Sequence, residues 1–139
     1  MDTESLLSLG KPSYHLGIDI GSPKDSIIIS IFSGIVTYTG FNGAYGYTVI
    51  IENDEFSAAY SHISPYFLVY VGQPVTQGMV IATVGPKNVY GVFENPYRDS
   101  KGNPTNGATT GPHLHLTIKK DDKVVNPLNY LTYISSSSL

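Results

Sequence analysis

The sequence predicts an all-β domain, and three observations lead to this prediction. Short runs rich in Val, Ile, Tyr and Phe recur along the chain, and clusters of turn-forming residues separate them. The 139 residues include 14 glycines and nine prolines, which suit many tight turns. The one helix candidate, Thr3–Leu9, is too short to be stable alone. We therefore expect antiparallel sheets with few short helices.

The expected strands follow from β-rich runs between turn signals. In the stretch VIIENDEFSAAY, two such runs flank a short polar turn, which predicts a hairpin. The runs are, in chain order, Ile27–Ile31, Gly34–Thr39, Tyr47–Glu52, Phe56–Tyr60, Val80–Val84, His113–Ile118 and Lys123–Val125.

One long segment, Pro86–Gly111, contains turn-forming residues throughout and has no sustained period. Loops of this length in a small domain are usually functional or disordered. The segment leads directly into the run that begins at His113, so we expect it to form a wall of a binding groove. A variable surface loop is the alternative.

Charge and composition exclude several classes of protein. The net charge is -3 and the basic residues are scattered, so neither nucleic-acid phosphates nor an anionic bilayer is an expected partner. No apolar run is long enough to span a membrane, and the first residues do not resemble a signal peptide. The absence of cysteine excludes disulfides, thiolate metal sites and cysteine nucleophiles.

The motif TGPHLHLTI places two histidines one residue apart. On a strand, His113 and His115 would share one face with Thr117, while Leu114 and Leu116 would face the core. The strand rise separates the two histidine positions by roughly 6.5 Å, which lets both imidazoles meet around one atom. Two exposed histidines on a sheet surface explain the motif equally well.

The motif YHLGIDI places His15 four residues before Asp19. A straight strand would hold the two side chains about 13 Å apart, too far to share one ion. Gly17 lies between them and tolerates the backbone angles of a bend, which would let them converge. The alternative is a surface histidine and a turn aspartate.

The remaining histidine, His62, lies where the Phe56–Tyr60 strand is expected to end. With it the chain offers four histidines and Asp19 as candidates for one site. Two histidines, a carboxylate and an open position make a catalytic zinc arrangement, whereas structural zinc sites are closed, mostly by cysteine. Three of the five could bind zinc, which would leave two imidazoles for proton transfer.

Taken together, these motifs resemble those of the lysostaphin/LytM-type zinc endopeptidases, which cut peptides in bacterial peptidoglycan. The matching pieces span roughly residues 14–130, nearly the whole chain. They are His15-x-x-x-Asp19, Tyr60-Ser-His-Ile-Ser64, Gly72-Gln-x-Val75-x-x-Gly78, Thr110-Gly-Pro-His-Leu-His-Leu116 and Val125-Asn-Pro-x-x-Tyr130.

The resemblance implies an open groove between antiparallel sheets and one Zn²⁺ per chain, held by His15, Asp19 and His115. It assigns His62 and His113 to catalysis. The extent of the match predicts a domain at residues 14–131 after an N-terminal extension at 1–13, and the serine-rich end of the chain predicts a flexible tail at 132–139. The implied partners are peptidoglycan peptides, without nucleic acid or membrane insertion.

The sequence departs from the family pattern in two ways. Residues 85–112 separate the Val84 strand from His113, which is longer than usual, so substrate preference does not transfer. Many relatives carry a signal peptide, which is not evident here. This favours a phage tail-associated enzyme that reaches the wall from outside on the virion, or a piece of a larger polypeptide.

Two other functions are compatible with parts of the sequence. The first is a catalytically inactive module on the same fold that binds the wall or a protein. The second is a lipoyl or biotinyl carrier, because GQPVTQGMVIATVG resembles the hairpin of those domains. No Met-Lys pair follows it, and the nearest following lysine is Lys87.

Overall fold

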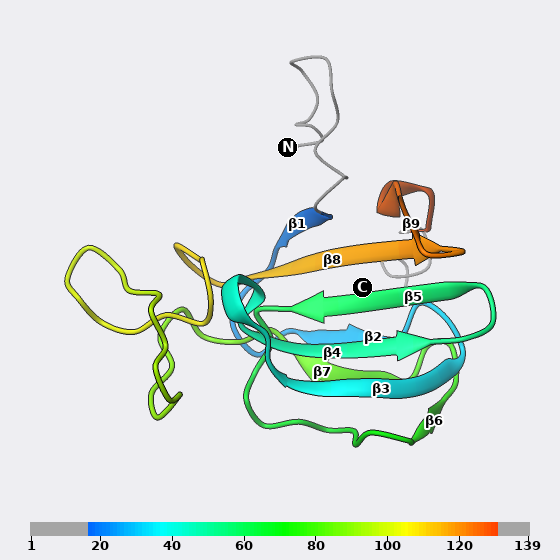
Figure 1. The fold of residues 1–139 in the computed structure, drawn as a ribbon, viewed down its shortest axis with the longest axis horizontal. Helices are drawn as coiled ribbons and strands as arrows, with labels where there is room; N and C mark the ends of the chain where they lie inside the picture. The colour runs from blue at the N-terminus through cyan, green and yellow to red at the C-terminus, as the bar shows by residue number, and fades with distance from the viewer. Residues whose placement is uncertain (1–16, 131–139) are drawn as a thin grey trace, which may run out of the picture.

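The computed structural model describes residues 17–130, and its regular secondary structure is almost entirely antiparallel strands (Figure 1). Two short 3-10 segments, η1 (Gly43–Tyr45) and η2 (Pro127–Tyr130), are the helical elements in this range. The strands are β1 (Ile18–Gly21), β2 (Ile27–Ile29), β3 (Gly34–Phe41), β4 (Tyr47–Glu52), β5 (Phe56–Ser61), β6 (Pro74–Val75), β7 (Val80–Thr83), β8 (His113–Lys120) and β9 (Lys123–Val125).

The strands form two sheets. The larger has the order β1-β8-β5-β4-β3-β6, with β9 also pairing with β8, and the smaller pairs β2 with β7. Every pairing is antiparallel, which confirms the predicted fold class. The hairpin predicted from VIIENDEFSAAY is the β4-β5 pair.

All seven expected strands are present, with differences at their ends. The strand expected over Ile27–Ile31 ends at Ile29, where the register with β7 is irregular. Two strands were not expected, β1 and the two-residue β6. The helix expected at Thr3–Leu9 lies outside the described residues.

The hydrophobic core lies between the two sheets. Along β8, Leu114, Leu116 and Ile118 are buried and alternate with half-buried His113 and His115. This alternation is the pattern of a strand with one face on the core, as predicted. Residues of the small sheet join the same cluster, among them Ile28, Ile81 and Ala82.

Tyr60 connects the core face of β5 to the end of β2. Its side chain is fully buried, and its hydroxyl oxygen accepts a hydrogen bond from the backbone N–H of Ile31 at 2.9 Å. Burial raises the pKa of Tyr60 to about 12. Tyr60 is therefore a structural tyrosine, because a neutral phenol fills the core and satisfies a buried N–H.

The opposite face of the large sheet carries three cross-strand rows. Residues that lie directly opposite one another on paired strands point to the same face. The register therefore places Thr48, Ser61, His115 and Asp19 in the first row, Ile50, Ala59 and Thr117 in the second, and Glu52, Ser57 and Lys119 in the third.

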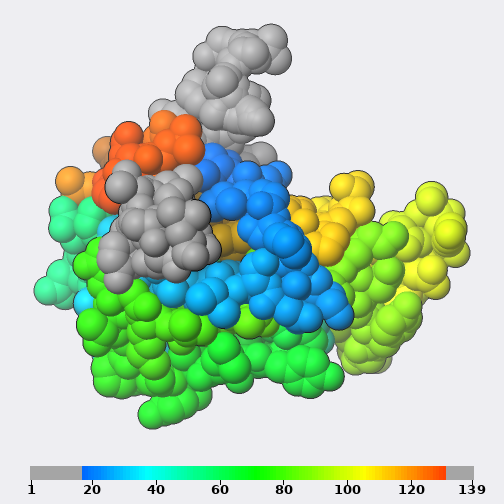
Figure 2. All heavy atoms as spheres, turned by 180° about the vertical axis from the view of Figure 1, so that it is seen from behind, coloured from blue at the N-terminus to red at the C-terminus, as the bar shows by residue number. Residues whose placement is uncertain are grey.

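The segment 86–111 projects from the body of the domain, as Figure 1 and the view from behind in Figure 2 both show. Isolated bridges join Asn88 to Thr105 and Arg98 to Pro104. Asp99 organises the far part of this segment. Its carboxylate accepts hydrogen bonds from the backbone N–H groups of Asn103 (2.9 Å) and Lys101 (3.0 Å), and it lies 3.1 Å from the Lys87 amine.

We expect Asp99→Asn to loosen this segment. The hydrogen bond from the Asn103 N–H, followed by those from Asn88 and Lys87, holds the pKa of Asp99 well below its ordinary value of 3.8. A lowered pKa means that the carboxylate stabilises the folded segment at neutral pH, and that this contribution is lost progressively as the pH falls below 3.8. Amide hydrogen exchange at Lys101 and Asn103 should be faster in the variant at pH 7. Asp54→Asn, a change in an exposed turn, is the control, and equal exchange in all three proteins would contradict the prediction.

Candidate functional site

Asp19, His113 and His115 come together because β1 pairs with β8. The register places Asp19 opposite His115, and both side chains point away from the core. An Asp19 carboxylate oxygen lies 2.6 Å from Nδ1 of His115 and 3.3 Å from Nε2 of His113. The two histidines of TGPHLHLTI therefore share one carboxylate, as neighbours on one strand face can.

Gly17 allows β1 to approach β8 this closely. Its φ of +96° lies in the left-handed region that favours glycine. A Cβ atom at this position would lie 2.6 Å from the Leu116 carbonyl oxygen and 2.7 Å from Nε2 of His115. Glycine is therefore favoured at this position both by its backbone angle and by the close approach of β8. His15 lies outside the described residues, so its convergence with Asp19 stays a prediction.

His62 reaches the same place from the end of β5. It follows the last strand residue, Ser61, and its φ of +60° is unusual for a residue with a side chain. Its backbone N–H donates to the Tyr45 carbonyl at 2.9 Å, and its own carbonyl accepts from Gly85 at 3.0 Å. These bonds turn the imidazole toward β8, where its ring centre lies 4.8 Å from that of His113.

Backbone carbonyls fix the ring tautomers of His62 and His113. Nδ1 of His62 lies 2.7 Å from the Asn106 carbonyl oxygen, and Nδ1 of His113 lies 2.9 Å from that of Gly111. A carbonyl oxygen only accepts hydrogen bonds, so each Nδ1 is the donor. In the neutral ring of His62, Nε2 then has a free lone pair to accept a proton, whereas Nε2 of His113 lies 3.3 Å from the Asp19 carboxylate.

Asn106 is a residue that sequence reasoning missed. It is fully buried, and its side-chain oxygen accepts from the Tyr47 N–H at 2.8 Å while its amide nitrogen donates to the Ile63 carbonyl at 2.9 Å. It thereby ties the loop before β8 to β4 and to the backbone beside His62. An asparagine followed by glycine reads as a turn, so no sequence signal separates this buried role from an exposed one.

The four described candidates line one pocket with Tyr45. The other lining residues are Ala44, Ala108, Thr109 and Thr110. The prediction that residues 86–111 form a groove wall therefore needs a correction. Only the end of that segment, Ala108–Thr110, lines this pocket, because the preceding residues pair with one another and project outward.

Burial and neighbouring groups shift the pKa values of the ionisable residues in the pocket in different directions. Desolvation lowers the pKa of His62 to about 4, against the hydrogen bond to Asn106, so this ring is neutral at pH 7. The hydrogen bond with Asp19 raises the pKa of His113. Hydrogen bonds from His113 and then His115 hold the pKa of Asp19 far below its ordinary value.

The donor types of the pocket suit zinc, which accepts imidazole nitrogen and carboxylate oxygen. Asp19 and His115 project from facing positions on paired strands, so both can reach one ion. Within residues 17–130, no group of three His, Cys, Asp or Glu residues is arranged to hold a metal ion. The predicted third ligand, His15, is outside that range.

No helix found between Gly17 and Tyr130 is long and apolar enough to cross a membrane. The fold is a small antiparallel β domain, and its pocket combines histidine and aspartate in the manner of metal-dependent hydrolases.

The chain belongs to peptidase family M23, whose family model matches residues 13–127. It is 36% identical over 118 residues to the murein hydrolase activator NlpD of Escherichia coli, an alignment that covers 83% of this chain and 25% of NlpD. It is 28% identical over 116 residues to the DD-carboxypeptidase/endopeptidase Mpg of Neisseria meningitidis, covering 83% of this chain and 22% of Mpg. The chain thus spans about a quarter of the length of these relatives.

Solved structures show the same fold. The catalytic domain of the antimicrobial peptidase lysostaphin from Staphylococcus simulans superposes with a TM-score of 0.65 at 23% identity, covering 84% of this chain and 78% of that domain. A zinc-containing peptidase from Vibrio cholerae superposes with a TM-score of 0.62 at 27% identity, covering 80% of this chain and 28% of that protein. The predicted resemblance and the lysostaphin-like fold are confirmed.

Proposed function

We propose that this protein is a zinc-dependent endopeptidase that hydrolyses peptide bonds in bacterial peptidoglycan. The observation that carries the proposal is the convergence of Asp19, His62, His113 and His115 on one pocket from distant parts of the chain. Membership of a peptidase family supports hydrolysis of peptide bonds. The name of the relative Mpg, a carboxypeptidase and endopeptidase, supports the same activity.

In the proposed site, His15, Asp19 and His115 hold one Zn²⁺. When bound, zinc polarises the scissile carbonyl and lowers the pKa of water. The neutral His62, with its Nδ1 donating to Asn106, presents Nε2 to accept a proton. His113, with its Nδ1 donating to Gly111, presents Nε2 to the developing oxyanion or to the leaving amine. Either imidazole can act as the base.

The second candidate function is a module that binds the wall or another protein without catalysis. The relative NlpD is named a hydrolase activator, which favours this alternative. The proposed enzyme is preferred because all five family positions carry the expected histidine or aspartate.

We further propose that the catalytic domain comprises residues 14–131, flanked by an extension at 1–13 and a tail at 132–139, and that it belongs to a larger polypeptide or a virion tail assembly. The partial coverage of its relatives supports the first of these settings. The domain would then act on the wall from outside the cell.

Digestion of purified peptidoglycan tests this proposal. Walls that differ in the chemistry of their cross-bridges are incubated with the protein, and new amino termini are identified by labelling and mass spectrometry. We expect new termini from at least one wall type, their loss after a chelator removes the metal, and their return with one equivalent of Zn²⁺ per chain. No new termini on any wall would favour the binding module, and turnover by metal-free protein would contradict the mechanism.

A further inference from the structure

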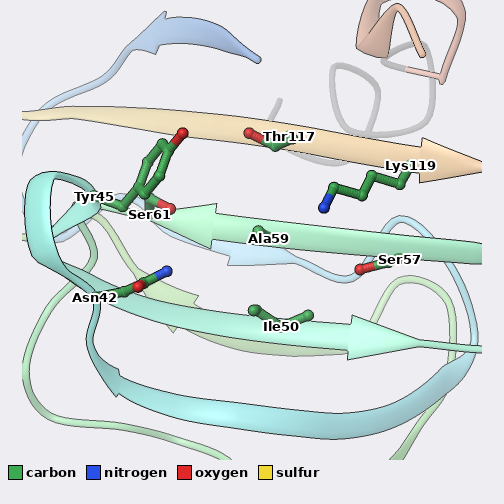
Figure 3. A pocket seen from close by; sticks show the side chains of 8 residues that line it. All are labelled: Asn42, Tyr45, Ile50, Ser57, Ala59, Ser61, Thr117 and Lys119. Carbon is green, nitrogen blue, oxygen red and sulfur yellow. The ribbon is translucent and has the colours of Figure 1, made fainter. Parts of the chain in front are cut away.

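A second hollow continues from the histidine pocket along the outer face of the large sheet (Figure 3). The two share Tyr45, and Ser61 in the hollow lies directly opposite His115 on the neighbouring strand. The remaining lining residues are Asn42, Ile50, Ser57, Ala59, Thr117 and Lys119. The hollow is therefore an extension of the candidate site.

The shape of the hollow follows from the sequence of β5. On the outer face this strand carries only small side chains, Ser57, Ala59 and Ser61, whereas the neighbouring strands carry Ile50 and Thr117. A central strand of small residues between larger neighbours leaves a trough that runs along the strands. An extended peptide matches such a trough, because its own rise per residue equals that of the strands beneath it.

Lys119 supplies the positive charge in this trough. It follows His115 by four residues on the same face of β8, so their backbones lie about 13 Å apart. Figure 3 shows its side chain directed back along β8, toward the end where Tyr45 lies. The amine thus lies over the trough rather than beyond its end.

Neither neighbouring acidic residue forms an ion pair with Lys119. Glu52 occupies the same cross-strand row as Lys119, but its carboxylate accepts from the Ser57 hydroxyl at 3.4 Å. Glu55 pairs at 3.4 Å with Lys120, the adjacent lysine. Among residues 17–130, Lys119 forms no ion pair with an aspartate or glutamate. A carboxylate entering the trough would therefore meet an ammonium group that has no ion-pair partner within the described residues.

We propose that Lys119 is a specificity-determining residue that binds a carboxylate of the peptide substrate. By strand geometry this carboxylate lies roughly two to four residues from the scissile bond. The inference rests on the proposed peptidase function and adds the chemical class of the preferred substrate, an acidic peptide.

The test compares Lys119→Gln with wild type on soluble peptidoglycan fragments whose carboxyl groups are free or converted to methylamides. For wild type we expect KM to rise about fivefold on methylamidation, the size of an exposed to partly buried charge contact. Lys119→Gln should show the higher KM on both substrates, with kcat unchanged. Lys119→Arg keeps the charge and should keep the preference.

Lys120→Gln is the matched control, because it removes an adjacent lysine that is already paired with Glu55. It should behave as wild type. Co-sedimentation with insoluble walls repeats the comparison without turnover, using His113→Ala as the background. The bound fraction should fall when Lys119→Gln is added and should not change when Lys120→Gln is added.

The outcomes distinguish a failure of the proposed peptidase function from a failure of the proposed role of Lys119. Failure of wild type to cleave any fragment would overturn the proposed function. Cleavage with the same KM on free and methylamidated fragments, or an equal preference in wild type and Lys119→Gln, would overturn the role of Lys119 and leave the peptidase proposal standing.

Discussion

Substitution of His113 by alanine is expected to lower kcat on peptidoglycan by about 10²- to 10⁴-fold, the usual contribution of a positioned acid or base. Zinc content should stay at one ion per chain, because His113 is assigned to proton transfer and oxyanion stabilisation rather than to the metal. The fold should survive, since 20% of the His113 side chain is exposed and its ring faces the pocket rather than the core.

His115→Ala is the matched variant, because it removes the same ring two residues along the same strand face. It should lose both zinc and turnover, since it takes away a ligand. The comparison is read by metal analysis and wall digestion on the same preparations. If His113→Ala lost zinc and His115→Ala retained it, His113 would be the zinc ligand and His115 the residue of proton transfer. Full turnover by His113→Ala would remove this residue from the mechanism.

Substitution of Asn106 by alanine is expected to impair both stability and catalysis. It leaves the half-buried Tyr47 N–H and the buried Ile63 carbonyl without their side-chain partners, at a cost of about 1–3 kcal/mol for the fully buried group and less for the other. It also releases the backbone that positions the carbonyl bonded to His62. Because a small misplacement of a catalytic group can cost about 10²-fold in rate, kcat should fall more than KM rises.

Two measurements separate positioning from simple loss of stability. The ¹⁵N chemical shifts of His62 report the tautomer, and we expect the Nδ1–H form in wild type and a mixture in Asn106→Ala at a temperature where the variant is folded. Asn103→Ala, an exposed asparagine of the same segment, should change neither the shifts nor kcat. An unchanged His62 tautomer and kcat in folded Asn106→Ala would show that Asn106 has only a structural role.

Strands that contain long β-rich runs were predictable, because side-chain alternation on a half-buried sheet leaves a direct trace in sequence. Along β8 the alternation gives both the buried leucines and the half-buried histidines that face away from the core. Strand β1 was not predictable, because it has only four residues and ends in glycine. Its position is set by pairing with β8. Strand β6 has two residues and begins with Pro74, so it lacks any periodic signal and occurs at a sheet edge.

The side chains of the candidate site that belong to short sequence motifs were predictable, whereas the backbone groups that orient them were not. His113, His115 and Asp19 follow from short motifs, and the structure brings them within hydrogen-bonding distance. The carbonyls of Asn106 and Gly111 that orient the imidazoles leave no sequence signal, because every residue has a carbonyl group. The outward course of the segment before Ala108 was also missed, since its direction depends on the internal contacts of Asp99.

A crystal structure of the zinc-loaded protein, with anomalous diffraction measured at the zinc edge, tests the central claim most directly. The account predicts one zinc ion per chain, bound within about 2.0–2.2 Å of an Asp19 carboxylate oxygen and of nitrogens of His115 and His15. His62 and His113 should lie beside the ion without binding it. Zinc held by His62 or His113 in place of these ligands, or active crystals without zinc, would contradict the account.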